Sequence, residues 1–174
     1  MKIAVIGYSG SGKSTLAKHL GEETGYPVLH LDKVNFLPGW QERDCAEARA
    51  MVTAFMAQDD WIIDGNYGDL HCGLRMAAAD KIMMLCLPRR VCFPRAYLRY
   101  LKSRNQVRES MAEGCEEKFD YAFAKWILKD GRSKRHRDWY RSLQKAYPEK
   151  VLFCQNSRDV RKLLESGKIW QSEC

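Results

Sequence analysis

The sequence predicts an α/β fold, a three-layer α/β/α sandwich in which a five-stranded parallel sheet lies between two layers of helices. Short apolar runs alternate with stretches of helical periodicity, which is typical of βαβ units. The run at Lys81–Leu87 is continuously apolar after its first residue and ends at Pro88, as expected of a parallel strand buried on both faces. The length of 174 residues suits one hydrophobic core, so we expect a single domain over residues 1–174.

In the first half of the chain, the predicted strands are short apolar runs and the predicted helices carry apolar residues at helical spacing. Gly25 follows the first helix as a stop signal, and Gly65 closes the third strand. Residues 32–43 contain Pro38-Gly39 and are predicted to form a loop. The predicted elements are a strand at Lys2–Ile6, a helix at Lys13–Thr24, a strand at Pro27–Leu31, a helix at Asp44–Gln58, a strand at Trp61–Asp64 and a short helix at Asp69–Ala78.

The second half continues the alternation. After the strand at Lys81–Leu87 comes a long basic helix that tolerates or is kinked by Pro94. Gly131 separates the next two helices, and Gly167 stops the last one. The predicted elements are helices at Arg89–Arg104, Glu116–Lys129 and His136–Tyr147, a strand at Val151–Cys154 and a helix at Asp159–Ser166.

Composition narrows the class of protein. The apolar runs are far shorter than the ~18–20 residues that cross a bilayer, and the first of them is too short for a secretory signal. The seven cysteines are odd in number and form no Cys-x-x-Cys pair, which argues against a disulfide framework or a structural zinc site. We therefore expect a cytoplasmic protein with no membrane partner, and the sequence does not predict its oligomeric state.

Positive charge is concentrated in two segments of a chain whose formal net charge is +7. Residues 88–108 carry seven Lys and Arg and no acid, and residues 125–150 carry nine against three acids. The remainder of the chain therefore has a formal charge of −6. Such segments indicate either a polyanionic partner or a solvated surface.

The motif with the clearest chemistry is Gly7-Tyr8-Ser9-Gly10-Ser11-Gly12-Lys13-Ser14-Thr15, which matches G-x-x-x-x-G-K-[ST] between a predicted strand and a predicted helix. Its glycines let the backbone approach phosphate oxygens, and its N–H groups and the helix N-terminus bind them. This phosphate-binding loop (P-loop) predicts binding of a nucleoside triphosphate, and the cofactor that we expect with the kinase hypothesis below is ATP. The predicted cofactor-binding residues here are Gly7, Ser9, Gly10, Ser11, Gly12, Lys13, Ser14 and Thr15.

Three P-loop side chains have predicted roles. Lys13 is a candidate catalytic residue because its ammonium would neutralise the β- and γ-phosphates. The Ser14 hydroxyl is a candidate Mg²⁺ ligand, since this hard cation prefers oxygen and keeps most of its waters. Thr15 would support the α-phosphate.

Two aspartates follow predicted strands at the carboxyl edge of the sheet, where ligands of open α/β sheets bind. Asp64 after Trp61-Ile62-Ile63 would hold a water on Mg²⁺, although an Asp-Gly turn signal is the structural alternative. Asp32 would accept a proton from an acceptor hydroxyl, position that acceptor or join the metal shell, with a helix or turn cap as an equal alternative. His30 is expected to pack or to satisfy a local hydrogen bond.

The basic helix holds two more candidate catalytic residues. Arg95 and Arg99 are four apart and share one helical face, and arginines stabilise the charge that spreads over a phosphoryl group in transfer. A solvated helix face is the alternative, and the lack of acids in residues 88–108 favours ligand contact. Residues 131–137 form a second basic arm whose phosphate contacts the spacing does not identify.

The chain resembles the nucleoside-monophosphate-kinase-like branch of P-loop NTPases, as in adenylate kinases. Asp64-Gly65, the pair Arg95 and Arg99 and the P-loop carry this resemblance. It implies a short helical lid around residues 100–135. It also implies that Arg95 stacks on the ATP base and that Arg99, together with Arg132 or Arg135, contacts the phosphates. The loop at Gln155–Ser157, which includes Asn156, would border the adenine. Asn66-Tyr67 replaces the acceptor-side arginine of adenylate kinases, so the resemblance does not extend to AMP as acceptor.

A second resemblance is to bacterial topology modulation proteins. It rests on Gly-x-Ser-Gly-Ser-Gly-Lys-Ser, Leu31-Asp32, Trp61-x-x-Asp-Gly-Asn-Tyr, Leu87-Pro88-Arg89 and Glu117–Asp120 with Trp126. That family's name implies an effect on DNA topology, whereas its motifs are those of a small-molecule kinase.

Two hypotheses follow. The first is a small-molecule kinase that moves the γ-phosphoryl of Mg·ATP to a small acceptor near Asp32, possibly a nucleoside or nucleotide. The second is a nucleic-acid-associated ATP-binding protein or ATPase that affects DNA topology and whose basic segments bind the phosphate backbone of the nucleic acid. The kinase is favoured because the acids and arginines surround one predicted site, and no nucleic-acid-binding signature is visible.

Overall fold

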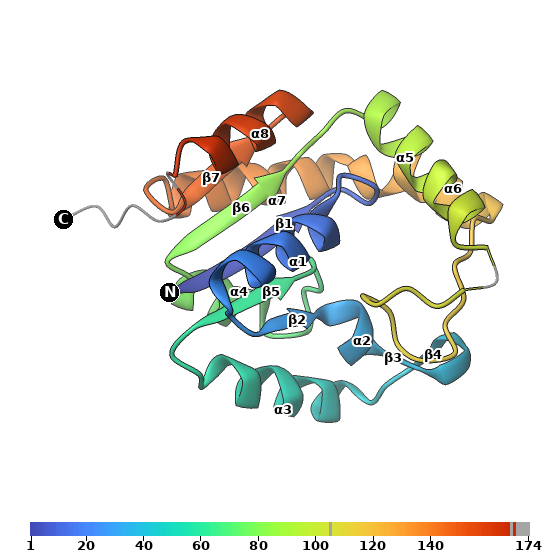
Figure 1. The fold of residues 1–174 in the computed structure, drawn as a ribbon, viewed down its shortest axis with the longest axis horizontal. Coiled ribbons are helices and arrows are strands. Elements are labelled where there is room, and N and C mark those ends of the chain that lie inside the picture. Colours follow the sequence, from blue (N-terminus) through green and yellow to red (C-terminus); the bar gives the residue numbers. More distant parts are fainter. Residues whose placement is uncertain (105, 168, 170–174) are drawn as a thin grey trace.

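The computed structural model describes residues 1–104, 106–167 and 169. Its main sheet has five strands in the order β2-β5-β1-β6-β7, and every neighbouring pair is parallel (Figure 1). The predicted five-stranded parallel sheet is therefore confirmed. The strands are β1 (Lys2–Gly7), β2 (Val28–His30), β5 (Trp61–Asp64), β6 (Lys81–Leu85) and β7 (Val151–Cys154).

The strand register brings three chain segments together at the carboxyl edge of the sheet. His30 at the end of β2 pairs with Asp64 at the end of β5. Asp64 pairs in turn with Val5 of β1, two residues before Gly7, which opens the P-loop. Asp64, the segment that carries Asp32 and the P-loop therefore all lie at the ends of neighbouring strands.

Apolar side chains on the two faces of the sheet form separate cores, which confirms the three-layer arrangement. Ala4 and Ile6 of β1 pack with α3, α4 and α7 on one face. Ile3 and Val5 pack with α1, α5 and α6 on the other, where residues of α8 also join. The alternation along β1 is what a strand buried on both faces requires.

The predicted helices are present, most with ends that differ by a few residues. The first, α1, matches its prediction. The helices are α1 (Lys13–Thr24), α3 (Cys45–Met56), α4 (Cys72–Ala78), α5 (Arg89–Lys102), α6 (Tyr121–Leu128), α7 (Lys134–Ala146) and α8 (Ser157–Glu165), with a 3₁₀ turn η2 (Asp130–Arg132) between α6 and α7.

The predicted loop at residues 32–43 is wrong, since this segment contains regular structure. The short helix α2 (Leu31–Asn35) directly follows β2 and therefore shortens the predicted strand. A two-stranded antiparallel hairpin follows, with strands β3 (Phe36–Leu37) and β4 (Gln41–Glu42) joined by the 3₁₀ turn η1 (Pro38–Trp40). Helix α2 buries only Leu31 and Val34, and two apolar positions are too few for a visible helical period.

The helix predicted at Glu116–Lys129 begins five residues late. Asp120 caps α6 by accepting a hydrogen bond from the Phe123 N–H. The preceding residues are extended, because Glu116 forms a β-bridge with Val107 and the Glu117 N–H donates to the Gln106 carbonyl. Residues 103–120, here called the α5–α6 connection, thus fold back on themselves; Asn105 lies outside the described residues.

The α5–α6 connection packs against the β3–β4 hairpin, as Figure 1 shows. Met111, Ala112 and Cys115 are buried against Phe36 and Trp40. Hydrogen bonds join the two segments as well: Trp40 Nε1 donates to the Glu116 carbonyl at 3.2 Å and the Gly39 N–H donates to the Gly114 carbonyl at 3.3 Å. The connection therefore spans the space from α5 to the hairpin on the P-loop side of the sheet.

No helix in the part of the chain that the structure describes is long and apolar enough to cross a membrane.

Candidate active site

The P-loop backbone lies so close to neighbouring segments that two of its positions require glycine. A Cβ on Gly7, whose φ is 146°, would lie 2.2 Å from the Leu85 carbonyl oxygen. A Cβ on Gly10, whose φ is 78°, would lie 2.4 Å from the Cys92 carbonyl oxygen. Strand β6 and helix α5 therefore support the loop from behind, and only glycine fits these contacts.

Helix α1 begins at the P-loop without a side-chain cap. Its N-cap residue Gly12 has φ 98°, and the first turn contains no acidic residue. The first N–H groups of such a helix have no intrahelical partner and form an anion site together with the helix dipole. Lys13 Nζ donates to the Tyr8 carbonyl at 3.1 Å, which places its charge at the mouth of the loop.

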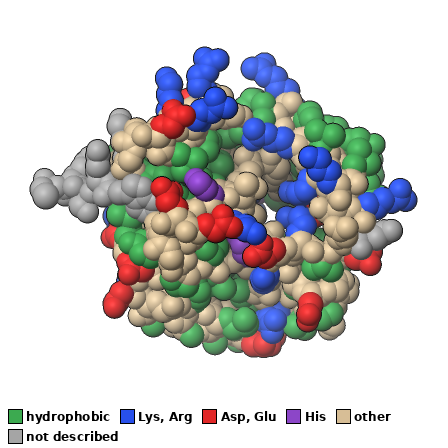
Figure 2. All heavy atoms as spheres, in the orientation of Figure 1, with side chains coloured by type: hydrophobic (Ala, Val, Ile, Leu, Met, Phe, Trp, Pro, Cys, Tyr) green, Lys and Arg blue, Asp and Glu red, His purple; other side chains and the backbone are tan. Residues whose placement is uncertain are grey.

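Two cavities open at this loop. The smaller, of about 320 Å³, is lined by Gly10, Gly12, Lys13, Ser14, Thr15, Lys18, His30, Arg99, Arg108, Glu109 and Ser110. The larger, of about 1040 Å³, extends from the P-loop to α6 and α7, and its wall includes Asp32, Asp64, Tyr67, Glu117 and many aromatic side chains. Figure 2 shows a hollowed face with Lys and Arg side chains gathered beside the hollow.

The two cavities share part of their lining. The shared residues come from the P-loop, the start of α1, helix α5 and the α5–α6 connection: Gly10, Lys13, Ser14, Arg99 and Arg108. Three of these five are lysine or arginine side chains, so the junction is suited to an anionic group that both cavities would contact.

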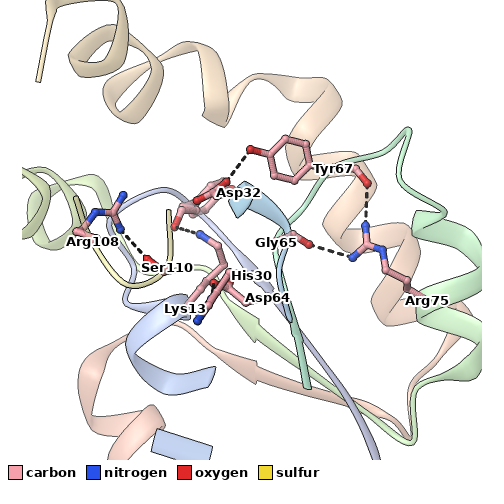
Figure 3. A network of polar contacts seen from close by, with 10 residues as sticks. Lys13, His30, Asp32, Asp64, Gly65, Tyr67, Arg75, Arg108 and Ser110 are labelled. Atoms are coloured by element: carbon pink, nitrogen blue, oxygen red, sulfur yellow. Dashed lines mark hydrogen bonds and ion pairs between the residues drawn. The ribbon is translucent and has the colours of Figure 1, made fainter. Parts of the chain in front are cut away.

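Asp64 lies at the end of β5 and is 4% exposed. His30 Nδ1 lies 3.0 Å from its Oδ2, which agrees with the expectation that His30 satisfies a local hydrogen bond (Figure 3). Among the described residues, Asp64 Oδ1 has no hydrogen-bond partner although it is buried beside the larger cavity. Buried carboxylate oxygens are normally satisfied, so an oxygen without a protein partner fits a hydrated cation.

Ser14 lines the same cavity as Asp64 and would supply a second oxygen. Within the described residues, no group of three or more His, Cys, Asp and Glu side chains is placed to hold a metal ion. A hydroxyl, one carboxylate and the oxygens of a bound phosphate are a donor set that fits Mg²⁺, which keeps several waters and needs few protein ligands.

Asp32 lies in the first turn of α2 rather than at the end of a strand, and it lines the larger cavity. The Tyr67 hydroxyl donates to Asp32 Oδ1 at 2.6 Å (Figure 3). Burial raises the pKa of Tyr67, and the neighbouring Asp32 carboxylate raises it further. Tyr67 therefore remains a proton donor that fixes one Asp32 oxygen and leaves the other for a ligand.

The loop that carries Tyr67 is held by Arg75 of α4, a fully buried cation. Its guanidinium donates to the Leu70 carbonyl at 2.8 Å. It also donates to the carbonyls of Gly65 at 3.1 Å and Tyr67 at 2.7 Å (Figure 3). Burial lowers the pKa of Arg75. Its planar fork satisfies three buried acceptors at once, which a lysine would not do.

Replacement of Arg75 with methionine is expected to destabilise the protein by about 3 kcal/mol, because three buried carbonyls lose their donor. Chemical denaturation measures this change in the free energy of unfolding. The matched control is Arg49→Met, which removes an exposed arginine bonded to the Asp69 carbonyl of the same loop and is expected to cost about 0.5 kcal/mol or less. Equal effects of the two substitutions would contradict this role of Arg75.

Asn66 ties the same loop to the P-loop. The Gly7 N–H donates to Asn66 Oδ1 at 3.0 Å, and Asn66 Nδ2 donates to the Gly7 carbonyl at 2.9 Å. The side chain thus pairs with the Gly7 backbone as a neighbouring strand would, and it extends the β1–β5 contact beyond Asp64. Asn66 occupies the stretch where the adenylate-kinase resemblance would place an arginine.

Arg99 and Arg108 converge on Glu117, whose side chain is 2% exposed. Glu117 Oε1 accepts from Arg99 Nε at 2.9 Å and pairs with its Nη2 at 2.7 Å, and Oε2 accepts from Arg108 Nε. The lack of acids within residues 88–108 therefore does not leave these two arginines without a carboxylate partner. Their partner lies nine residues beyond that segment and returns to it through the α5–α6 connection.

Arg95 and Asn156 lie together beside the P-loop but line neither cavity. Arg95 Nη2 donates to Ser157 Oγ at 2.9 Å, and its Nη1 lies 3.5 Å from the Ser11 carbonyl. Asn156 caps α8 by accepting from the N–H groups of Arg158 and Asp159. The structure thus brings Arg95 to the loop after β7, and Asn156 in this loop caps α8.

The second basic arm contacts the P-loop through Arg132. Its guanidinium lies over the Tyr8 ring at 3.9 Å and donates to the carbonyls of Ile127 and Leu87, both at 2.9 Å. Nearby, Trp126 Nε1 donates to Ser9 Oγ at 3.2 Å. Both Arg132 and Arg135 line the larger cavity, but Arg132 is largely committed to protein contacts, whereas Arg135 is exposed.

Sequence reasoning did not assign a site role to five residues: Asn66, Tyr67, Arg108, Glu117 and Trp126. Arg108 was counted only as part of a charged segment, although it lines both cavities. Asn66 and Tyr67 directly follow Asp64-Gly65, so their proximity to the predicted site was a usable signal. Nothing in the sequence pattern indicates which distant arginines Glu117 contacts.

The sheet order, with a P-loop after the central strand β1, defines an α/β fold of the P-loop class. The chain is similar to the structure of a shikimate kinase from Acinetobacter baumannii in complex with shikimate, with a TM-score of 0.56, 14% identity and coverage of 97% of this chain and 94% of that one. It is also similar to an uncharacterized protein from Eubacterium ventriosum, with a TM-score of 0.54, 15% identity and coverage of 99% and 100%. At these identities the likeness shows the fold.

A deoxyadenosine kinase from M. mycoides with bound dATP matches with a TM-score of 0.49, 14% identity and coverage of 98% of this chain and 100% of that one. No protein-family model and no curated protein sequence matches the chain. The resemblance to topology modulation proteins therefore stays a prediction.

Proposed function

We propose that the protein is a small-molecule kinase that moves the γ-phosphoryl group of Mg·ATP to a small acceptor. The observation that carries this proposal is the pair of cavities that meet at Gly10, Lys13, Ser14, Arg99 and Arg108. One cavity follows the P-loop and the start of α1, where a triphosphate would bind, and the other is large enough for a second molecule. A transferred phosphoryl group must contact both ligands, and the cationic junction suits it.

On the nucleotide side, the P-loop N–H groups and Lys13 would bind the β- and γ-phosphates. Ser14 and, through a water, Asp64 would hold Mg²⁺, which draws negative charge from the phosphate oxygens when it is bound. Arg95 and Asn156 are the proposed neighbours of the nucleotide base. Their support is the contact of Arg95 with both Ser11 and the loop after β7.

On the acceptor side, Asp32 would accept the proton of the acceptor hydroxyl. The hydroxyl oxygen then forms a bond to the γ-phosphorus while the bond from that phosphorus to the β,γ-bridging oxygen breaks, which leaves ADP. Lys13, Arg99 and Arg108 would stabilise the charge on the moving group. Support comes from the second oxygen of Asp32, which accepts no hydrogen bond from the described residues, and from the three cations at the junction.

The acceptor cavity favours a planar molecule. Its wall contains five aromatic side chains besides the two tyrosines, Tyr8 and Tyr67: Phe36, Trp40, Phe123, Trp126 and Trp139. Aromatic rings stack on planar ligands, so a nucleoside or nucleotide is the first acceptor class to examine. We also propose that residues 1–174 act as one domain, with the segment around residues 100–135 as its lid.

The test is a panel of nucleosides, nucleotides and small alcohols incubated with the protein and Mg·ATP while ADP release is followed. The proposal predicts that at least one acceptor raises ADP release well above the rate with water alone. It fails if no member of the panel does so while a polynucleotide stimulates turnover.

A second candidate, a nucleic-acid-associated ATPase, is favoured by one observation. Most basic residues of helix α7 are exposed and line neither cavity, among them Lys134, Arg137, Arg141 and Lys145. DNA binding measured against salt separates the candidates, because contact with several phosphates makes affinity fall steeply as salt rises. Undetectable or salt-insensitive binding would remove this candidate.

A further inference from the structure

Glu117 is a buried carboxylate in the α5–α6 connection, where it lines the larger cavity beside the two arginines of the junction. Its side chain is 2% exposed, and both of its oxygens contact guanidinium groups. A buried carboxylate destabilises a protein unless it is paired and hydrogen-bonded. The two guanidinium groups supply this pairing for Glu117.

The partners come from different parts of the chain. Arg99 belongs to helix α5, whereas Arg108 belongs to the irregular connection after it. Burial lowers the pKa of Arg99, and the charge of nearby Arg108 lowers it further. Two guanidinium groups this close repel each other, and the carboxylate between them offsets that repulsion.

Two arginines against one carboxylate leave a surplus positive charge at the junction. Both guanidinium groups line both cavities, so they also face the space that an anion would enter. Arg108 Nη1 is fixed from a second direction, because it donates to Ser110 Oγ at 3.1 Å (Figure 3). The arrangement has the features of a preorganised anion receptor, which needs no rearrangement when its ligand arrives.

We infer that Glu117 is a positioning residue that sets Arg99 and Arg108 as one receptor for the γ-phosphate and so couples the α5–α6 connection to recognition of ATP. This inference rests on the proposed function. Glu117 itself contacts no reacting atom and acts through the two arginines. ADP lacks the γ-phosphate, so the receptor distinguishes ATP from ADP. The P-loop backbone contacts the phosphates that both nucleotides have, and these contacts do not distinguish them.

The test compares the affinities of Mg·ATP and Mg·ADP by isothermal titration calorimetry. Glu117→Gln keeps the size of the side chain but removes its charge and aims an amide N–H₂ at a guanidinium group. We expect the ATP-over-ADP preference to fall about tenfold, as for one misplaced charge-assisted contact, while affinity for ADP changes less than about threefold. Glu117→Asp keeps the charge one methylene further away and is expected to restore part of the preference.

The matched control is Glu113→Gln, an exposed glutamate in the same connection that lines neither cavity; its preference is expected to equal that of the wild type. Thermal denaturation of each variant separates folding from recognition. If the ATP-over-ADP preference of Glu117→Gln equals that of the wild type, with or without a lower melting temperature, Glu117 only stabilises the fold. That result overturns the inference.

If Glu117→Gln does not fold, Glu117→Asp decides: a preference lowered about threefold supports the inference, and an unchanged preference overturns it. Wild-type protein that binds neither nucleotide would refute the proposed function itself. A different outcome would refute only the inference about Glu117: the wild-type protein prefers ATP, and the Glu117 variants keep the same preference.

Discussion

Replacement of Lys13 with alanine is expected to lower acceptor-stimulated ADP formation by about 10³-fold, a loss of about 4 kcal/mol of transition-state stabilisation. Lys13 is the P-loop cation at the junction of the two cavities, and Nζ lies 3.1 Å from the Tyr8 carbonyl at the mouth of the loop. Without Lys13, the negative charge on the moving phosphoryl group would lose the stabilising lysine ammonium of the P-loop. Steady-state kinetics with Mg·ATP and a stimulating acceptor measure the loss.

The control for this substitution is Lys145→Ala, which removes an exposed lysine of α7 outside both cavities. Its rate is expected to stay within about twofold of the wild type, since surface substitutions away from a site change little. Thermal denaturation should show that both variants are folded. Turnover in folded Lys13→Ala at the wild-type rate would contradict P-loop catalysis in this protein.

Replacement of Asp32 with asparagine is expected to lower the same rate by about 10²- to 10⁴-fold while affinity for Mg·ATP changes less than about threefold. The physical reason is that an amide does not accept the hydroxyl proton, although it can still receive the hydrogen bond from Tyr67. Kinetics against acceptor concentration and calorimetry with Mg·ATP separate the two quantities.

The matched control for Asp32 is Asp59→Asn, an equal change of charge at an exposed position that lines neither cavity. Equal loss of nucleotide affinity and of rate in Asp32→Asn would assign Asp32 to the metal shell. A rate that does not change would leave Asp32 as a turn residue held by Tyr67, and the acceptor side of the proposal would fail.

The core of the fold was predictable because it depends on local patterns. The apolar run before Gly7 and the periodicity after Lys13 are visible in the sequence, and they place the P-loop at the edge of a buried sheet. Asp64 was placed for the same reason, since it ends a strand of four buried residues. Helix α2 and the β3–β4 hairpin escaped prediction because they are too short to show a period.

The candidate site was predictable only where its residues lie next to a motif. Asp64 ends strand β5, Lys13 and Ser14 come after the end of β1, and the parallel sheet brings these two strand ends together. Glu117 lies eighteen residues after Arg99 and nine after Arg108, and a chain reversal closed by one β-bridge brings the three together. Arg75 was missed for a related reason: its partners are backbone carbonyls, which leave no trace in the sequence.

The most direct test of the central claim follows the γ-phosphoryl group itself. ATP labelled at its γ-phosphorus is incubated with the protein, Mg²⁺ and a stimulating acceptor, and the products are separated. Two cavities that meet at one cationic junction predict that the label appears in the phosphorylated acceptor in equal amount to the ADP formed. Label found only in inorganic phosphate, with any acceptor and with polynucleotide alike, would show an ATPase and contradict the kinase account.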